Sequence, residues 1–194
     1  SRVGVIGHSA GGYLTLLAGH RVHPAPQALV SFYGYGDLVG NWYSNPDPFY
    51  NTFDQVTDDD AHRAVGEREL VDGAADPRRG DFYLWCRQKG LWPLKVGGHD
   101  PASESDWFTP YSPAQNIVAR QYPPTLLLHG DADADVPYGQ SVHVERQLAD
   151  AGIDHDFITI PGGPHGFDHA PDIQASIEVS EAFDRVIAFF RQHV

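Results

Sequence analysis

Short apolar runs rich in β-branched residues recur along the chain, and each run ends directly at a glycine or a proline. Their length is that of strands, and the residues that stop them are turn formers. The sequence therefore predicts four strands, at Val3–Ile6, Ala28–Tyr33, Thr125–His129 and Asp156–Ile160.

Apolar residues at helical spacing follow the first, third and fourth of these runs. Gly152 stands where a helix C-cap would be. The pattern predicts helices over Tyr13–Ala18, over Gly139–Ala151, and from about Ile173 to Val194. The last of them carries its apolar residues at Ile177, Phe183, Val186, Ile187 and Phe190.

Strands that alternate with helices, each strand a nearly continuous apolar run, are typical of a mostly parallel sheet covered on both faces. We therefore predict the α/β class. With 194 residues, the chain is long enough for one globular domain with a real core, and too short for two full ones.

The stretch between residues 37 and 113 breaks this pattern, because it holds many aromatic, Pro, Gly and Asp residues and no clear strand. Such a length is unusual for a simple connection, so we predict an inserted cap with short helices of its own, for example around Gly80–Gly90. Its aromatic residues either line a pocket or form only the core of the cap. They include Trp42, Tyr43, Phe49, Tyr50, Phe53, Phe82, Tyr83, Trp85, Trp92, Trp107 and Phe108.

The charge balance argues against several classes of partner. Lys and Arg number 13 and Asp and Glu 26, which gives a net charge of -13. This charge repels nucleic acids and anionic lipid, so we expect neither nucleic acid nor a membrane as a partner. The single cysteine, Cys86, rules out an internal disulfide, and we expect it to pack as a small apolar residue beside Trp85.

The first strand runs into Gly7-His8-Ser9-Ala10-Gly11, which fits the G-x-S-x-G nucleophile elbow. In that turn the serine oxygen is exposed, and small flanking residues avoid a clash in the strained backbone. Ser9 is therefore the candidate nucleophile. The backbone N–H of Ala10, at the start of a helix, is the candidate oxyanion donor.

A serine nucleophile needs a base and an acid that orients it. Three aspartates, Asp131, Asp133 and Asp135, follow the third strand. Their carboxylates would emerge at the same edge of a parallel sheet as Ser9. An EF-hand is excluded, because Val136 and Val142 stand where a calcium loop needs Gly and Glu.

His165 follows the fourth strand and would reach that same edge. Ser, Asp and His in this chain order are typical of the α/β-hydrolase triad rather than of the chymotrypsin or subtilisin types. His169 could suggest a metal pair with His165, but no helix holds the two on one face and no third ligand is evident. We expect no metal and no cofactor.

The boxes GHSAGG, HGDADADVP and PHGF resemble those of the α/β-hydrolase superfamily, in its esterase, dienelactone-hydrolase-like and prolyl-oligopeptidase-like branch. The resemblance spans nearly the whole chain outside the insertion. In such families the acid lies three residues past the Gly of the His-Gly pair. This implies Asp133, with Asp135 the main rival, and gives the catalytic set Ser9, Asp133 and His165.

The same resemblance implies that the chain opens at the fifth strand of an eight-stranded sheet. The earlier strands and a second oxyanion donor would then be missing, and we expect an N-terminally truncated catalytic domain over residues 1–194. An oxyanion donor lost from another serine hydrolase costs on the order of 100-fold or more in rate. We therefore expect the isolated chain to be poorly soluble or nearly inactive.

These features predict a serine hydrolase that cleaves small-molecule carboxylic esters. A prolyl-oligopeptidase-type serine peptidase and a non-catalytic binding protein on the hydrolase fold remain alternatives. The sequence assigns neither a compartment nor an oligomeric state.

Overall fold

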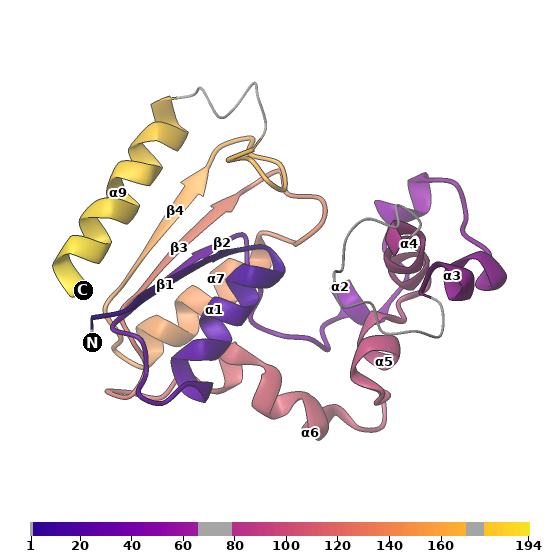
Figure 1. Ribbon diagram of the computed structural model, residues 1–194, viewed down its shortest axis with the longest axis horizontal. Coiled ribbons are helices and arrows are strands. Elements are labelled where there is room, and N and C mark those ends of the chain that lie inside the picture. Colours follow the sequence, from indigo (N-terminus) through magenta and orange to yellow (C-terminus); the bar gives the residue numbers. More distant parts are fainter. Residues whose placement is uncertain (1, 66–78, 170–176) are drawn as a thin grey trace. The chain divides into compact units, whose positions relative to one another are not determined.

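Four parallel strands form one sheet in the order β1-β2-β3-β4 (Figure 1). The computed structural model of the chain describes residues 2–65, 79–169 and 177–194. The strands are β1 (Gly4–His8), β2 (Ala28–Phe32), β3 (Thr125–Gly130) and β4 (His155–Ile160). All four predicted strands are present, and the predicted parallel sheet is confirmed.

Helices cover both faces of this sheet. Helix α1 (Ala10–Arg21) packs on β1 and β2, and α7 (Gly139–Asp150) packs on β3 and β4. Helix α9 (Ile177–His193) contacts β2, β3 and β4 from the opposite face (Figure 1). The α/β class predicted from the alternating pattern is confirmed, because β2, β3 and β4 each contact a helix on both faces of the sheet.

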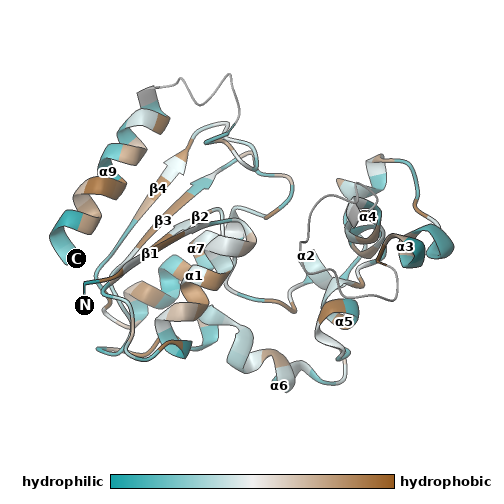
Figure 2. Ribbon diagram, in the orientation of Figure 1, coloured by the Kyte–Doolittle hydropathy of each residue, from teal (hydrophilic) through white to brown (hydrophobic). Residues whose placement is uncertain are grey.

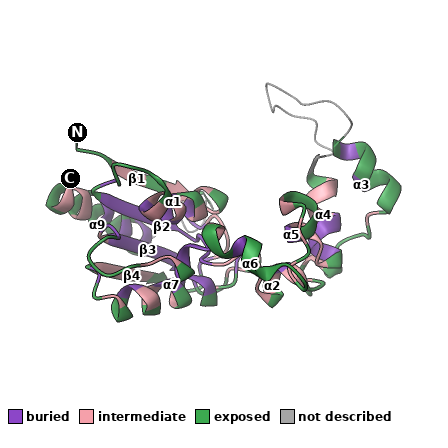
Figure 3. Cartoon of the chain, turned by 90° about the horizontal axis from the view of Figure 1, so that it is seen from below, coloured by how far each residue is buried: buried purple, intermediate pink, exposed green. Residues whose placement is uncertain are grey.

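The two central strands are buried along their whole length (Figure 3). Alternate side chains of a strand point to opposite faces, so β2 and β3 feed two separate apolar clusters. One cluster lies beneath α9 and includes Val30, Phe32, Leu126, Leu128 and Phe167. The other lies beneath α1 and α7 and includes Leu16, Leu29, Leu127, Val144 and Leu148.

Strand β1 stands at one end of the described sheet and pairs with β2 alone among the described strands. Its side chains are the least covered, and Ile6 remains 45% exposed. The sequence predicts such an apolar edge at Val3–Ile6.

Helix α9 is amphipathic, with hydrophilic and hydrophobic residues both present along its length (Figure 2). Val179, Ala182 and Val186 are buried in the core, whereas Phe183 is 38% and Ile187 49% exposed. The amphipathic helix predicted from this spacing is present over Ile177–His193. Residues 173–176 of the predicted helix lie outside the described residues. Neither α9 nor any other described helix has the length and apolarity needed to cross a membrane.

Residues Leu38–Phe108 form a second compact unit, and residues 1–37 and 109–194 form the first. Helix α4 (Arg79–Lys89) of the second unit corresponds to the helix predicted around Gly80–Gly90. The first unit also holds the 3₁₀ turns Thr109–Tyr111 and Pro113–Gln115. The described helices of the second unit are α2 (Asn41–Ser44), α3 (Asp58–Val65), α4 (Arg79–Lys89), α5 (Trp92–Gly97) and α6 (Ser105–Phe108), with a 3₁₀ turn at Tyr50–Thr52.

The second unit has its own core. Cys86 is buried with Trp85 and Ala61, as the sequence predicts for this cysteine. Beside them lies the buried guanidinium of Arg87, which donates to Asp47 Oδ2 at 2.6 Å and to the Tyr83 hydroxyl at 2.7 Å. Its charge is thus paired, and aromatic rings surround it: Trp42, Tyr43, Tyr50 and Tyr83.

Candidate active site

Ser9 occupies the sharp turn between β1 and α1 in a strained conformation, with φ 54° and ψ −121°. A non-glycine residue with positive φ costs on the order of 1–3 kcal/mol and persists only where its surroundings hold it. Here the Ser9 N–H donates to Phe32 O at 3.0 Å, and Ser9 O accepts from the Tyr13 N–H at 3.0 Å. The Ser9 hydroxyl does not cap α1, so it is available for other partners.

The glycines around Ser9 differ in how much room a side chain would have at each position. A Cβ on Gly7 would lie 2.2 Å from Gly11 O, and a Cβ on Gly12 would lie 2.8 Å from Phe32 O. A Cβ on Gly11 would meet no described atom within 4 Å. The expectation that small residues on both sides of Ser9 avoid a clash thus holds for Gly7 but not for Gly11. The essential second glycine is Gly12, and the Gly-Gly pair in the sequence was its signal.

His165 lies between Ser9 and Asp133. Its Nδ1 is 2.8 Å from Asp133 Oδ2, and its Nε2 is 3.0 Å from Ser9 Oγ. Because a carboxylate only accepts, Nδ1 carries the proton, and Nε2 is left to accept the hydrogen bond of the Ser9 hydroxyl. The edge of the Tyr33 ring packs against the imidazole, with the ring centroids 4.7 Å apart. The structure therefore brings Ser9, His165 and Asp133 together in one hydrogen-bonded row.

The side chain of Asp133 is fully buried, and both of its oxygens accept hydrogen bonds. Oδ1 accepts from the backbone N–H groups of Asp135 and Val136, each at 2.9 Å. Oδ2 faces His165 at 2.8 Å and His129 Nε2 at 3.2 Å. Four donors thus hold this carboxylate in one orientation.

Burial alone would raise the pKa of Asp133, but the hydrogen bonds from His129 and His165 outweigh it. Together with the charge of His165 and the Val136 N–H, they lower the pKa from 3.8 to about 2. A carboxylate that accepts several hydrogen bonds favours its charged form. Asp133 is therefore ionised at neutral pH and can stabilise a positive charge on His165.

The two rival aspartates occupy other places. Asp135 Oδ2 lies 3.6 Å from His165 Nε2, on the side of the ring that faces Ser9. Asp131 Oδ1 accepts the Gly162 N–H at 2.6 Å and so ties two loops together. Of the three, Asp133 is the one that meets Nδ1, the atom that an orienting acid must hold.

Ala10 is the first residue of α1. The first four N–H groups of a helix have no acceptor within it, and the partial positive charge of the helix end favours an anion there. The Ala10 N–H is therefore free of an intrahelical partner directly after Ser9. The oxyanion role of this group remains a prediction.

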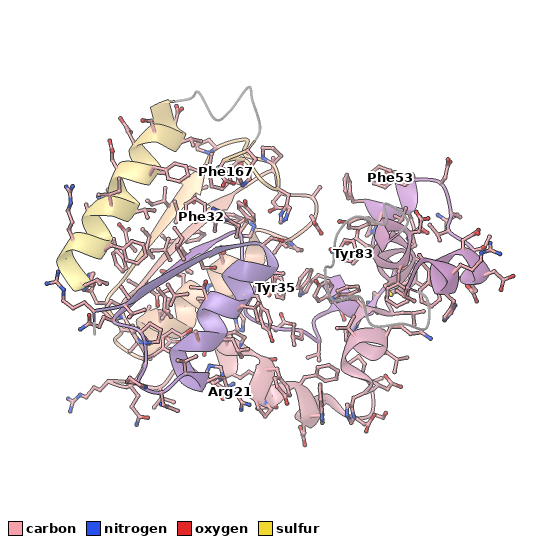
Figure 4. All side chains as sticks on the ribbon, in the orientation of Figure 1. Arg21, Phe32, Tyr35, Phe53, Tyr83 and Phe167 are labelled. Carbon is pink, nitrogen blue, oxygen red and sulfur yellow. The ribbon has the colours of Figure 1, made fainter. Side chains whose placement is uncertain are left out.

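The loop that carries His165 is anchored by the residues that follow it. Phe167 is buried and stacks on Phe32 with the centroids 6.0 Å apart (Figure 4). Asp168, also buried, accepts a hydrogen bond from the Tyr33 hydroxyl, and its Oδ2 lies 3.1 Å from His8 Nε2. Sequence reasoning did not select Tyr33, Asp168 or His129. His129 opens the HGDADADVP box and Asp168 directly follows the PHGF box, whereas no motif marks Tyr33.

His169 does not face His165 as a metal partner would. Its Nε2 lies 3.3 Å from Asp168 Oδ2. Within the described ranges there is no group of three or more His, Cys, Asp or Glu side chains arranged to hold a metal ion.

Comparison with known proteins places this site in a family. The model of the prolyl oligopeptidase family matches residues 92–194, more than half of the chain. The chain belongs to the prolyl oligopeptidase family. Asp133 and His165 lie inside the matched region, and Ser9 lies before it.

Solved structures support the same α/β-hydrolase fold. A protein of unknown function from Staphylococcus aureus superposes with a TM-score of 0.72 at 19% identity, over 99% of this chain and 65% of that one. A truncated carbohydrate esterase from gut microbiota superposes with a TM-score of 0.61 at 22% identity, over 100% of this chain and 60% of that one. Acylaminoacyl peptidase from Pyrococcus horikoshii superposes with a TM-score of 0.64 at 19% identity, over 100% of this chain and 24% of that one. Fold and family together identify the chain as a member of the prolyl oligopeptidase family with an α/β-hydrolase fold.

Curated relatives of another description also match. Non-reducing polyketide synthase ausA from Penicillium brasilianum is 22% identical over 233 residues, which cover 100% of this chain and 9% of that protein. The chain spans about a tenth of the length of the curated relatives that it matches over its whole length. It resembles one part of these proteins and no more.

Proposed function

We propose that this member of the prolyl oligopeptidase family hydrolyses carboxylic esters through an acyl-enzyme on Ser9. The observation that carries the proposal is the 3.0 Å separation between Ser9 Oγ and His165 Nε2, with Asp133 on the far side of the imidazole. A serine hydroxyl becomes a useful nucleophile when a base so placed can take its proton during attack.

In the first stage His165 Nε2 accepts the Ser9 proton while Oγ bonds to the ester carbonyl carbon. The carbonyl oxygen becomes an oxyanion next to the Ala10 N–H. The carbon–oxygen bond to the alcohol then breaks, and His165 returns the proton to the departing alcohol. Asp133 stabilises the imidazolium that forms between these steps without taking its proton.

In the second stage a water molecule takes the place of the alcohol. His165 removes a proton from the water as its oxygen attacks the acyl carbon. A second oxyanion collapses, the acid leaves, and the proton returns to Ser9 Oγ. The net reaction consumes one water and yields one acid and one alcohol, so no cofactor is required.

The choice of esters over amides rests on the leaving group. An alcohol departs from a tetrahedral intermediate more readily than an amine does, so an ester demands less oxyanion stabilisation. The oxyanion donor that we assign is the Ala10 N–H. The carbohydrate esterase with a similar fold is consistent with this choice.

Two observations favour other acyl donors for the same chemistry. Membership of the prolyl oligopeptidase family favours a peptide bond as the second candidate. The polyketide synthase relatives favour a polyketide acyl chain, carried as an ester or a thioester. In each case Ser9 would form the same acyl-enzyme, and the difference lies in the atom that leaves.

We also propose, from its sequence pattern, that the aromatic-rich unit Leu38–Phe108 acts as a cap. Part of its aromatic surface packs within the unit around Arg87 and Cys86. Other rings, such as those of Phe49 and Phe53, are exposed.

The test uses the protein in which this chain occurs, together with its Ser9→Ala variant. A fluorophosphonate probe should label the wild type on Ser9 and leave the variant unlabelled. Absence of label on a folded wild type would favour the binding-protein alternative and overturn the proposal.

Specificity is measured with one acyl group on three leaving groups: a p-nitrophenyl ester, a thioester and an anilide. We expect kcat/KM to be highest for the ester. If kcat/KM were higher for the anilide than for the ester, the protein would be a peptidase rather than an esterase. If it were higher for the thioester, the result would favour release of an acyl chain from a thioester.

A further inference from the structure

His129, at the end of β3, is a fully buried polar side chain that the reaction described above does not use. Its Nδ1 lies 2.7 Å from Ser141 Oγ in the first turn of α7. Its Nε2 lies 3.0 Å from Val136 O and 3.2 Å from Asp133 Oδ2. Each polar atom of the ring therefore has a partner, and one partner is the acid of the candidate triad.

These partners fix the protonation of the ring. Val136 O and Asp133 Oδ2 only accept, so Nε2 must carry a proton to face both of them. Nδ1 is paired with the Ser141 hydroxyl, which holds the other side of the ring. The Tyr138 ring lies edge-on to it, with the centroids 5.7 Å apart. Asp133 is the charged group that it contacts.

We propose that His129, held by Ser141, is a positioning residue that sets the orientation and basicity of Asp133. This inference rests on the proposed function, because it assigns a role in the same hydrolytic site. The contacts run in one row. The Ser141 hydroxyl pairs with His129, the Nε2–H of His129 is shared between Val136 O and Asp133 Oδ2, His165 donates to Asp133, and Ser9 donates to His165.

The physical argument concerns the single oxygen that the two imidazoles share. The hydrogen bond from His129 keeps Oδ2 from turning away from His165 and withdraws part of its electron density. Without it, Oδ2 would be a stronger base and would hold the His165 imidazolium more tightly. The pKa of His165 would then rise, and the protonated form, which cannot accept the Ser9 proton, would persist to higher pH.

The decisive variants are His129→Leu, which removes the donor, and His129→Gln, whose side-chain amide places an N–H where Nε2 lies. We expect His129→Leu to lower kcat by about 10- to 100-fold with little change in KM, the size of effect that a hydrogen bond to a charged group supports. The acid limb of the kcat/KM profile should move to higher pH. His129→Gln should restore most of the rate and the original profile.

Ser141→Ala tests the outer end of the row without touching the imidazole. It should shift kcat and the acid limb in the same direction as His129→Leu, by a smaller amount. The matched control is Thr125→Val, because Thr125 is buried in the same strand at its opposite end and makes a side-chain hydrogen bond to Pro123 O. This control should keep the wild-type pH profile.

A direct measurement on the free protein separates this inference from the proposed function. Titration of the His165 ring, followed by NMR, should show a higher pKa in His129→Leu than in the wild type. If the wild type hydrolyses no ester but this shift is present, the esterase proposal fails and the positioning role stands. A folded His129→Leu protein with an unchanged His165 titration would overturn the positioning role, as would a His129→Gln protein that behaves like His129→Leu.

Discussion

The Tyr33 hydroxyl donates a hydrogen bond of 2.6 Å to Asp168 Oδ1, and so joins the end of β2 to the loop that carries His165. Burial and the neighbouring Asp168 raise the pKa of Tyr33, so the phenol keeps its proton and remains a donor. The Tyr33 ring also packs against His165. One side chain thus fixes both the loop and the imidazole.

Tyr33→Phe keeps the aromatic ring but removes the hydroxyl. The buried Asp168 Oδ1 then loses the hydrogen bond that Tyr33 donates. We expect a loss of about 1–3 kcal/mol in the free energy of unfolding. We also expect kcat to fall by about tenfold or more, because His165 is held less firmly. Chemical denaturation and steady-state kinetics measure the two effects.

Tyr138→Phe is the control for this variant, because its hydroxyl meets Thr159 Oγ1 at an exposed position. It should change stability and kcat little. A folded Tyr33→Phe protein with the kcat of the wild type would contradict the role given to this contact.

The elbow glycines give a second prediction. In Gly7→Ala the new Cβ would lie 2.2 Å from Gly11 O, so β1 and α1 could not keep their approach. We expect a destabilisation of about 3 kcal/mol or more and loss of probe labelling at Ser9.

Gly11→Ala is the matched substitution, two residues after Ser9 rather than two before it. Its Cβ meets no described atom, and alanine is favoured over glycine inside a helix. It should fold with unchanged or slightly higher stability, as measured by thermal unfolding. Equal damage from the two substitutions would contradict the geometry of the elbow.

The lowered pKa of Asp133 predicts how stability depends on pH. The pKa of the folded state is about 2, below the ordinary value of 3.8, so the folded protein binds this proton less readily than the unfolded chain does. The ionised carboxylate therefore stabilises the fold above the ordinary value, and this contribution is lost as the pH falls through about 2.

Asp133→Asn lacks this titration. The difference in free energy of unfolding between wild type and Asp133→Asn should be constant at pH 5–7 and should shrink as the pH falls from 3.8 to about 2. Urea denaturation across this range measures it. A difference that does not change with pH would show that Asp133 titrates normally.

The buried pair Arg87–Asp47 predicts a large effect in the second unit. Asp47→Ala leaves the buried guanidinium without its carboxylate, and breaking such a pair from one side costs about 3–5 kcal/mol. Asp60→Ala, which removes an exposed pair with Arg63 and a hydrogen bond from Thr57, should destabilise the unit much less, because these groups stay in contact with water.

All four tryptophans of the chain, at positions 42, 85, 92 and 107, lie in this unit. Tryptophan fluorescence during denaturation therefore reports on the second unit alone. Similar losses in Asp47→Ala and Asp60→Ala would refute the structural importance of the Arg87 pair.

Much of the fold could be predicted from sequence because its signals are local. Each strand is an apolar run stopped by Gly or Pro, and a parallel sheet follows from their alternation with helices. The order of Ser9, Asp133 and His165 at three strand ends then gave the candidate triad. The exposure of Phe183 and Ile187 could not be predicted, because helical spacing defines a face of α9 without fixing how far neighbouring layers cover it.

The sequence by itself determined the elbow at Ser9, the strands around it and the residue types of the site. Tertiary structure alone decided that His129 and His165 share one oxygen of Asp133, and that Tyr33 meets Asp168 135 residues away along the chain. The physical reason is that a hydrogen bond requires two atoms to meet within about 3 Å at a suitable angle. No local pattern encodes that meeting, since it depends on how separate strands and loops pack.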